Sequence, residues 1–256
     1  MPSSNSKYFV VFSFFSFFLI CRTQADPIYS SHACTDSLTY KPKTTFETNL
    51  NLLLSSLPSK ASGGSHFYRT RTGDAAPDAV NGLFLCRGDT LAAACLECVS
   101  AAAGEIKRRC PDQKEAIIWY DTCMVRYSNQ SFNKIVPSTD LSNTEDVAPE
   151  DKERFNEVLS GMLNSVAAKV LKSQNKFATE QVNFTTTETL YGLEQCTPDL
   201  TVSDCNTCLR SAIAAVPNCC DGKRGSTVLL PACNIRYEFY PFFSSTPPAP
   251  VSHSHP

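Results

Sequence analysis

The segment CRGDTLAAACLEC (residues 86–98) returns as CTPDLTVSDCNTC (residues 196–208), with its three cysteines at the same spacing. Two further cysteines follow each segment at equal distances: Cys110 and Cys123 in the first copy, Cys220 and Cys233 in the second. A constant shift of 110 residues relates all five pairs. Self-similarity at a fixed period is the signature of a repeated structural unit. The chain of 256 residues is therefore predicted to hold two copies of one domain.

The apolar pattern repeats with the cysteines and predicts two helices in each copy. Apolar residues recur at i, i+4, i+7, i+8 and i+11 over residues 46–57 and again over 155–166. A second helix is predicted over residues 95–106, with its counterpart over 205–216. Pro217 would end the second of these helices. Both cysteines of each Cys-x-x-Cys then lie one turn apart and face the core.

Alternating apolar residues predict strands around these helices. Residues 119–127 and 229–237 are each expected to form one strand, with Trp119 and Cys123 on the core face in the first copy and Leu229 and Cys233 in the second. Shorter strands are expected at residues 67–70, 82–85, 177–179 and 189–193. Each copy then runs strand, helix, strands, helix, strands. This order predicts an α+β fold with an antiparallel sheet.

The first 25 residues have the composition of a secretory signal peptide. An apolar run of 11 residues follows Lys7 and precedes the small residues around Ala25, whereas a membrane-spanning helix needs about 20 apolar residues. We therefore prefer a signal peptide to a membrane anchor and expect no later membrane span. The expected divisions are a first domain at 26–133, a linker at 134–151, a second domain at 152–243 and a Pro-rich disordered tail at 244–256.

The mature chain is expected to be extracellular. Without residues 1–25 it keeps 21 basic and 25 acidic residues, a net charge of −4, which excludes the electrostatic footprint of a nucleic-acid-binding protein. Of the 13 cysteines, Cys21 lies in the predicted signal peptide, and an even number of 12 remains for disulfides. The sequons at Asn129 and Asn183 are predicted glycosylation sites.

A Cys-x-x-Cys motif also occurs in thioredoxin-like redox enzymes and in zinc sites. The redox interpretation requires a βαβ context with a single motif, whereas this chain has two equivalent motifs inside cysteine-rich repeats. The zinc interpretation lacks a second close cysteine pair in each copy. Structural disulfides are the preferred interpretation, although six cysteines in one copy allow fifteen pairings.

The spacing Cys-x8-Cys-x2-Cys, together with the ending CNIRYEFYPF (residues 233–242), resembles the plant ginkbilobin-type repeat. That repeat occurs in salt-stress and antifungal cysteine-rich repeat secretory proteins and in the ectodomains of cysteine-rich receptor-like kinases. The resemblance covers roughly residues 32–243. It implies two similar domains, each a five-stranded antiparallel sheet with two helices, held together by disulfides.

The resemblance also implies a pairing of the cysteines. The implied pairs are Cys34–Cys110, Cys86–Cys95 and Cys98–Cys123 in the first copy, and Cys196–Cys205 and Cys208–Cys233 in the second. The second copy departs from the family pattern because no cysteine corresponds to Cys34, while Cys219 stands directly before Cys220. A Cys219–Cys220 disulfide and a free or reshuffled pair are both left open.

No catalytic residue is predicted. The chain has no nucleophile-elbow motif, no metal-ligand cluster and no phosphate-binding glycine loop, and His32 and His66 are expected to be solvated loop residues. Arg126 and Arg236 recur at one position of the repeat and are weak ligand-binding candidates. We prefer a structural role, in which the following tyrosine packs inward and the arginine meets water or a carboxylate.

The antifungal prototype of the resembled family binds mannose through an Asn, an Arg and a Glu at fixed distances from its cysteines. The first copy has Thr35, Ile117 and Ser128 at these positions and matches none of them. The second copy has Thr227 and Glu238 and matches only the glutamate. Glu238 is thus a weak candidate, and mannose binding by this trio is not expected. A different sugar, or a site between the two domains, remains open.

The leading hypothesis is a secreted, non-enzymatic and lectin-like binding protein of the plant apoplast that acts in stress or defence. Its expected partner is a cell-wall glycan or an extracellular protein, and no cofactor, metal or nucleic acid is expected. The alternative is an effector that acts directly on fungi. The net charge of −4 argues against action on membranes, because helices that act on membrane surfaces are rich in Lys and Arg. A redox enzyme is the third class considered, and thiol titration would distinguish it.

Overall fold

The computed structural model describes residues 26–35, 38–132 and 139–244. The predicted signal peptide and nearly all of the predicted tail lie outside these residues. The first domain contains β1 (Tyr29–Cys34), α1 (Thr45–Ser62), β2 (Phe67–Thr72), β3 (Val80–Cys86), α2 (Ala92–Arg109), β4 (Glu115–Tyr120) and β5 (Cys123–Ser128). The second contains β6 (Thr139–Ser142), a short 3-10 helix η1 (Pro149–Asp151), α3 (Lys152–Lys172), β7 (Phe177–Asn183), β8 (Thr189–Cys196), α4 (Val202–Cys219), β9 (Ser226–Leu229) and β10 (Cys233–Glu238).

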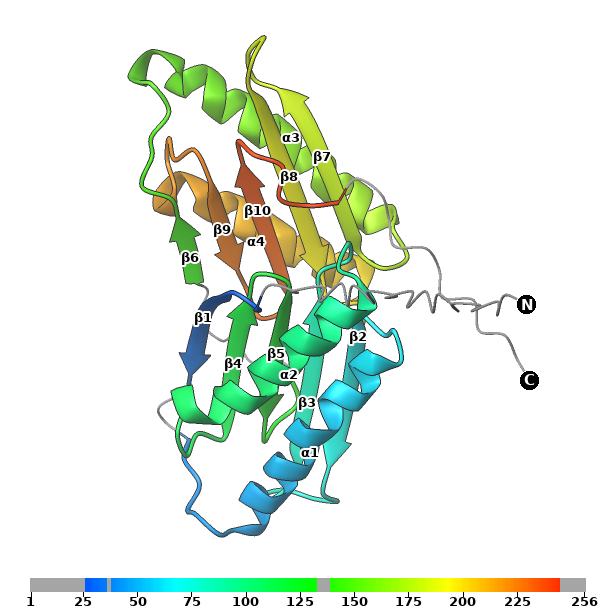
Figure 1. Ribbon diagram of the computed structural model, residues 1–256. Helices are drawn as coiled ribbons and strands as arrows, with labels where there is room; N and C mark the ends of the chain where they lie inside the picture. Colours follow the sequence, from blue (N-terminus) through cyan, green and yellow to red (C-terminus); the bar gives the residue numbers. More distant parts are fainter. Residues whose placement is uncertain (1–25, 36–37, 133–138, 245–256) are drawn as a thin grey trace, which may run out of the picture.

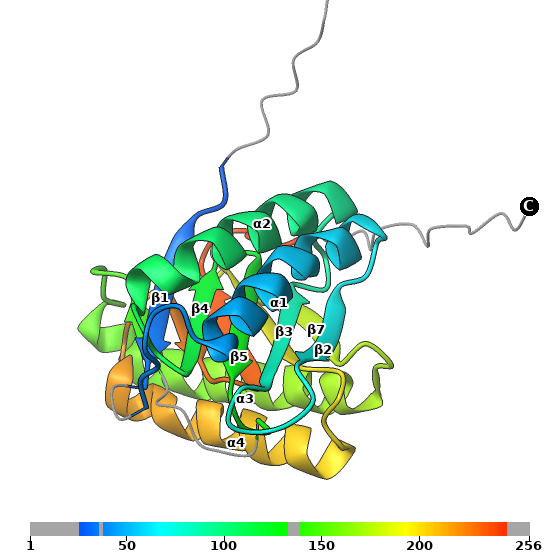
Figure 2. The same ribbon diagram turned by 90° about the horizontal axis from the view of Figure 1, so that it is seen from below.

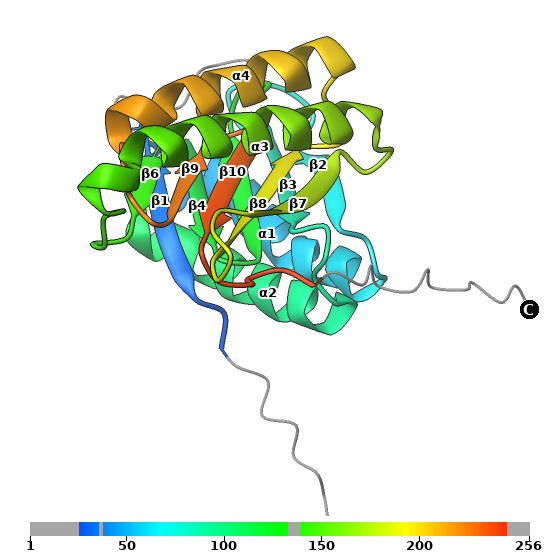
Figure 3. The same ribbon diagram turned by 90° about the horizontal axis from the view of Figure 1, so that it is seen from above.

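Each domain is a five-stranded antiparallel sheet covered on one face by two helices (Figure 1). The strand order is β1-β4-β5-β3-β2 in the first sheet and β6-β9-β10-β8-β7 in the second, so equivalent strands hold equivalent places. Seen from below and from above, the two helix pairs lie on the outside and the sheets lie between them (Figures 2 and 3). This arrangement confirms the predicted α+β class and the two similar domains.

Each helix pair packs on its own sheet and forms a separate core. Phe46, Leu50 and Leu57 of α1 are at most 1% exposed in the first core, and Phe155 and Val166 of α3 are fully buried in the second. Gly82 of β3 allows this packing, because a Cβ at that position would lie 2.2 Å from Leu53. The repeated apolar stripes are therefore the faces that build the two cores.

A third cluster lies on the helix-free faces, between the sheets. It joins five residues of the first sheet to Leu229 of β9: Leu83, Leu85, Ile117, Trp119 and Met124. Our prediction for Trp119 was wrong, because we placed it on the core face of a single strand with Cys123. A turn at residues 121–122 separates β4 from β5, and Trp119 pairs with Met124 across that hairpin. Leu229 is likewise separated from β10 by a turn and lies on the face opposite to the one we predicted.

The predicted linker at 134–151 also needs correction. Residues 139–142 form β6, which pairs with β9 as the edge strand of the second sheet. Val147 is 6% exposed and belongs to the second core. Neither feature shows as an apolar period, because β6 has one apolar residue, Leu141, which is exposed. The second domain therefore begins by residue 139.

The structure has six disulfides, and five of them are the pairs that the resemblance implied. The sixth joins the neighbours Cys219 and Cys220. The strand register explains this difference between the copies. Cys34 of β1 lies opposite Ala116, and the equivalent place on β6, opposite Ser226, is held by Ser142. Ser226 donates to the Sγ of Cys220 at 3.0 Å and hydrogen-bonds to the Oγ of Ser142 at 3.1 Å.

A cysteine at position 142 should restore the missing third bridge. In the variant Ser142→Cys/Cys219→Ala, the new thiol on β6 replaces the lost partner of Cys220, and we expect a disulfide between β6 and the end of α4. Peptide mapping without reduction would identify the cross-linked pair, with Cys219→Ala alone as the control that leaves Cys220 free. Recovery of two free thiols in the double variant would show that Ser142 does not occupy the place of Cys34.

Candidate functional site

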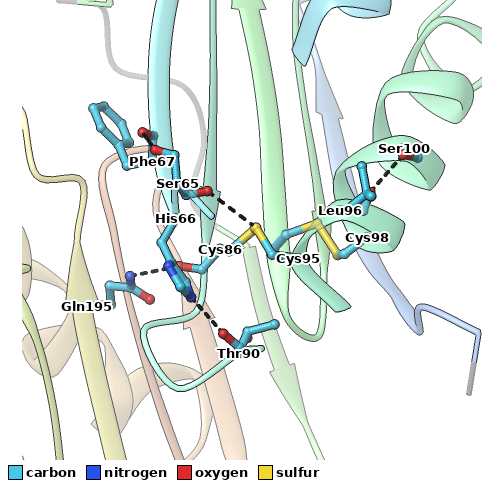
Figure 4. Close-up of a disulfide and its surroundings, with 11 residues drawn as sticks. Ser65, His66, Phe67, Cys86, Thr90, Cys95, Leu96, Cys98, Ser100 and Gln195 are labelled. Atoms are coloured by element: carbon cyan, nitrogen blue, oxygen red, sulfur yellow. Dashed lines mark hydrogen bonds between the residues drawn. A yellow bond between two sulfur atoms is a disulfide. The ribbon is translucent and has the colours of Figure 1, made fainter. Parts of the chain in front are cut away.

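The two domains meet through polar contacts around the inter-sheet cluster. Gln195 of β8 donates a hydrogen bond of 3.0 Å to the backbone oxygen of Cys86 on β3, beside the Cys86–Cys95 disulfide (Figure 4). Arg69 and Asp199 form an ion pair of 2.8 Å across the same boundary. Polar contacts between the domains therefore join the two cores.

A cleft opens along this boundary, with a volume of about 60 Å³. The first domain lines it with Arg87, Trp119 and Asp121, and the second with Thr227, Asn234 and Arg236. These residues come from strands β4, β9 and β10 and from turns at strand ends, so both sheets must be in place for the cleft to exist. Clefts at domain boundaries with a few convergent polar groups are the usual sites of ligand binding.

Arg236 is the central charge of the cleft. Its guanidinium contacts Asp121 of the first domain at 2.5 Å and Glu238 at 3.1 Å, and it donates to the hydroxyl of Tyr240 at 2.9 Å. Burial opposes its positive charge, but the two carboxylates outweigh this effect and raise the pKa of Arg236. Burial also raises the pKa of Glu238, although Arg236 counteracts it. The contact between Arg236 and Asp121 ties the two domains together at the cleft.

Trp119 forms part of the wall and is 2% exposed. Its Nε1 is buried and has no hydrogen-bond partner among the described residues. A buried donor without a partner costs about 1–3 kcal/mol, so this N–H reduces the stability of the packed interface.

The two repeated arginines have different environments. Arg236 lines the cleft, whereas Arg126 is 2% exposed, pairs with Glu115 at 2.8 Å and lies over the ring of Phe132. The tyrosines that follow them, Tyr127 and Tyr237, are fully buried. Sequence reasoning grouped the two arginines by position and could not separate them, because the neighbours that distinguish them come from other strands and from the other domain.

The five positions compared with the mannose trio are divided between the two sheets. Ile117 is buried in the inter-sheet cluster. The backbone N–H of Thr35 donates to the backbone oxygen of Glu115, and Ser128 pairs with Glu115 across the β4–β5 hairpin. Thr227 lines the cleft, and Glu238 bonds to Arg236. Sequence reasoning missed Asn234, Asp121 and Trp119 as cleft residues, because their spacing carries no motif.

The remaining predicted residues have these positions. Asn183 is exposed at the end of β7, and Asn129 is half-buried directly after β5. The loop prediction for His32 was wrong, because this residue lies on β1, where its Nδ1 hydrogen-bonds to the hydroxyl of Tyr29 at 2.6 Å. His66 is half-buried, and its Nε2 contacts the backbone oxygen of Thr90 at 2.7 Å (Figure 4).

The Cys-x-x-Cys motifs are not internally bonded. Cys95 pairs with Cys86, and Cys98 pairs with Cys123. Two clusters of possible metal ligands exist in the described residues, His32 with Cys34 and Cys110, and Asp140 with Cys219 and Cys220. In both clusters the sulfurs are joined in a disulfide, so neither provides the thiolates that zinc requires.

None of the helices in the described ranges combines the length and the hydrophobicity needed to cross a bilayer.

Comparison with known proteins identifies relatives over nearly the whole chain. An antimicrobial ginkbilobin-2-like protein of Castanea crenata is 40% identical over 243 residues, which are 93% of this chain and 98% of the relative. The cysteine-rich receptor-like protein kinase 25 of Arabidopsis thaliana is 45% identical over 251 residues. These residues are 96% of this chain but only 37% of the kinase.

The solved structures agree on the fold. The tandem DUF26 ectodomain of the Arabidopsis thaliana cysteine-rich receptor-like protein PDLP8 matches 84% of this chain and 99% of its own, with a TM-score of 0.69 and 24% sequence identity. The family described as Salt stress response/antifungal matches residues 33–130 and 141–240, one copy for each sheet. With two matched copies and a full-length relative at 40% identity, the chain belongs to the Salt stress response/antifungal family.

Proposed function

We propose that this chain is an extracellular, non-enzymatic binding protein whose interdomain cleft holds a neutral, hydroxylated ligand such as a sugar unit of a cell-wall glycan. The observation that carries this proposal is the set of groups on the cleft wall, where the amide of Asn234 and the hydroxyl of Thr227 lie beside the paired Arg236. The six disulfides and the extracellular domains among the relatives support the compartment.

The charge balance of the cleft favours a neutral ligand. Arg236 is already paired with Asp121 and Glu238, and Arg87 is paired with Asp89 at 2.6 Å. A charged ligand would have to displace one of these partners, whereas a hydroxyl group can donate to a carboxylate and accept from an arginine without breaking the pair. The walls that meet Trp119 are apolar, which suits the C–H face of a sugar ring.

The antimicrobial relative and the family description support direct antifungal action as a second candidate. On that hypothesis the glycan is a component of the fungal wall, and the same cleft contacts it. A growth assay on fungal hyphae with the cleft variants below would distinguish the two candidate functions. Glycan binding without inhibition of growth would contradict direct antifungal action.

Ligand binding should be visible in the emission of Trp119, the only tryptophan of the chain. Titration of the full chain with oligosaccharides retained on a glycan array should shift that emission with saturation. Asn234→Ala and Thr227→Val should each weaken binding about 3–10-fold, the effect of one hydrogen bond. Asn206→Ala on α4, on the helix side of the sheet, is the matched control and should bind normally. Unchanged affinity in both cleft variants would exclude this cleft as the site.

A further inference from the structure

A clasp between α1 and α2 in the first domain has no counterpart in the second. The Nζ of Lys107 on α2 donates to Glu47 at 3.0 Å and to Asn51 at 2.8 Å, both on α1. Hydrogen bonds from the backbone of Lys43 and from Lys107 lower the pKa of Glu47, so this carboxylate stays ionised in the clasp. One lysine thus bridges the open side of the helix pair.

The repeat shows what replaces these residues. With the shifts of 109 and 110 residues that relate the helices, Glu47, Asn51 and Lys107 correspond to Asn156, Ser160 and Pro217. Proline has no side-chain donor, so Pro217 cannot make the hydrogen bonds that Lys107 makes. The second helix pair therefore lacks a bridge at this point.

A cavity lies where the bridge is missing. Asn156, Ser160 and Pro217 line it with Asp221, and its volume is about 130 Å³. Its remaining walls are apolar side chains from both helices: Leu159, Leu163, Ile213 and Val216. Ile213 also borders a second groove between the same helices, so α3 and α4 are separated along much of their length. The volume of the cavity beside Pro217, about 130 Å³, is similar to that of an engineered apolar cavity of about 150 Å³ that binds benzene.

The polar groups of this cavity gather at one side. Asn156 donates to Asp221 at 3.2 Å, and Lys152 pairs with the other carboxylate oxygen of Asp221 at 2.7 Å. These hydrogen bonds lower the pKa of Asp221, which is therefore an ionised acceptor. An apolar wall with one anionic acceptor is complementary to an apolar group that carries a hydrogen-bond donor.

We propose that the α3–α4 cavity is a binding site for a small molecule with one aromatic ring or branched alkyl group and an amine or hydroxyl that reaches Asp221. The site lies on the helix side of the second sheet, away from the interdomain cleft, and it is independent of the function proposed above. In the first domain Lys107 occupies the equivalent position and bonds to Glu47 and Asn51.

The test uses 2-phenylethylamine and phenylacetate as probes of opposite charge on the full, disulfide-bonded chain. Methyl NMR should show saturable shifts at Leu159, Leu163, Ile213 and Val216 with the amine. The acid should bind about tenfold more weakly because its carboxylate has no hydrogen to donate to Asp221, a difference of about 1.4 kcal/mol. The absence of saturable shifts at these methyl groups, or equal binding of both probes, would overturn the proposal.

A restored clasp provides the variant that closes the site. Asn156→Glu/Ser160→Asn/Pro217→Lys places the three residues of the first domain between α3 and α4, and it should abolish amine binding. Ser211→Asn/Asn218→Glu makes similar changes on exposed positions of α4 and should bind like the natural chain. Ile213→Trp fills the cavity with a larger side chain. This variant can therefore test the proposal even if the clasp variant does not fold. Binding that survives both the clasp and the Ile213→Trp substitution would place the probe elsewhere.

Discussion

Replacement of Glu194 by leucine should raise the free energy of unfolding of the second domain by about 3 kcal/mol at pH 7. Glu194 lies on β8 between Ala178 and Ile235 of the neighbouring strands, on the face that packs against the helices. It is fully buried, and neither carboxylate oxygen has a hydrogen-bond partner in the described structure. The first domain has Phe84 at this position, also fully buried.

The effect should depend on pH with a definite sign. Burial raises the pKa of Glu194 from 4.5 to about 9, so between these values the folded protein keeps a proton that the unfolded chain releases. Below pH 4.5 the ionisation of Glu194 does not reduce the free energy of unfolding. Between pH 4.5 and pH 9 that free energy falls by about 1.4 kcal/mol per pH unit. Denaturant unfolding at several pH values would measure this slope.

Two variants separate the charge of Glu194 from its polarity. Glu194→Gln should remove the pH slope but keep a buried polar group, whereas Glu194→Leu should remove both. Glu180→Gln on β7 is the control, because Glu180 faces the same helices but is paired with Lys169 at 3.1 Å. A natural chain whose stability does not change between pH 5 and pH 9 would show that Glu194 is hydrated or paired in solution.

Loss of the Cys34–Cys110 disulfide should destabilise the first domain by about 4 kcal/mol, because this bridge closes the longest loop, with a sequence separation of 76. The variant Cys34→Ser/Cys110→Ser should lower the melting temperature of that domain by about 15 °C or more. Scanning calorimetry measures the change, and the second domain shows whether the inter-sheet contacts transmit it.

The Cys219–Cys220 pair is the natural control for this experiment. It joins adjacent residues and closes no loop in the unfolded chain, so Cys219→Ser/Cys220→Ser should cost less than about 1 kcal/mol by the same reasoning. Equal losses in the two double variants would show that chain entropy does not govern the stability of these domains.

The sequence was most informative where one copy could be read against the other. The shared stripe of Phe46 and Phe155 predicted the first helix of each domain, and the cysteine spacing, with the family resemblance, predicted five bridges. The edge strand β6 was not predicted, because its place in the sheet is set by backbone pairing with β9 rather than by an apolar period. Trp119 was assigned to the wrong face because a turn at residues 121–122 interrupts the alternation between it and Cys123.

The cleft was not predictable residue by residue for a related reason. Its walls combine Asp121 of one domain with Arg236 of the other, 115 positions apart, and no spacing rule connects them. A site between the domains was an open possibility from the sequence. Only the packing of the two helix-free faces identifies which of the repeated positions, Arg126 or Arg236, reaches the cleft.

The serine at position 142 makes the two domains unequal as mechanical elements. Pulled by its two ends, the first domain cannot extend between residues 34 and 110, because the disulfide carries the force past that loop. In the second domain hydrogen bonds and packing hold β6, and none of the described disulfides includes a residue between 139 and 195. If β6, α3, β7 and β8 all unfold, that stretch can reach a length of at most about 190 Å. The second domain is therefore the extensible part of the chain, and the first is the part that keeps its length.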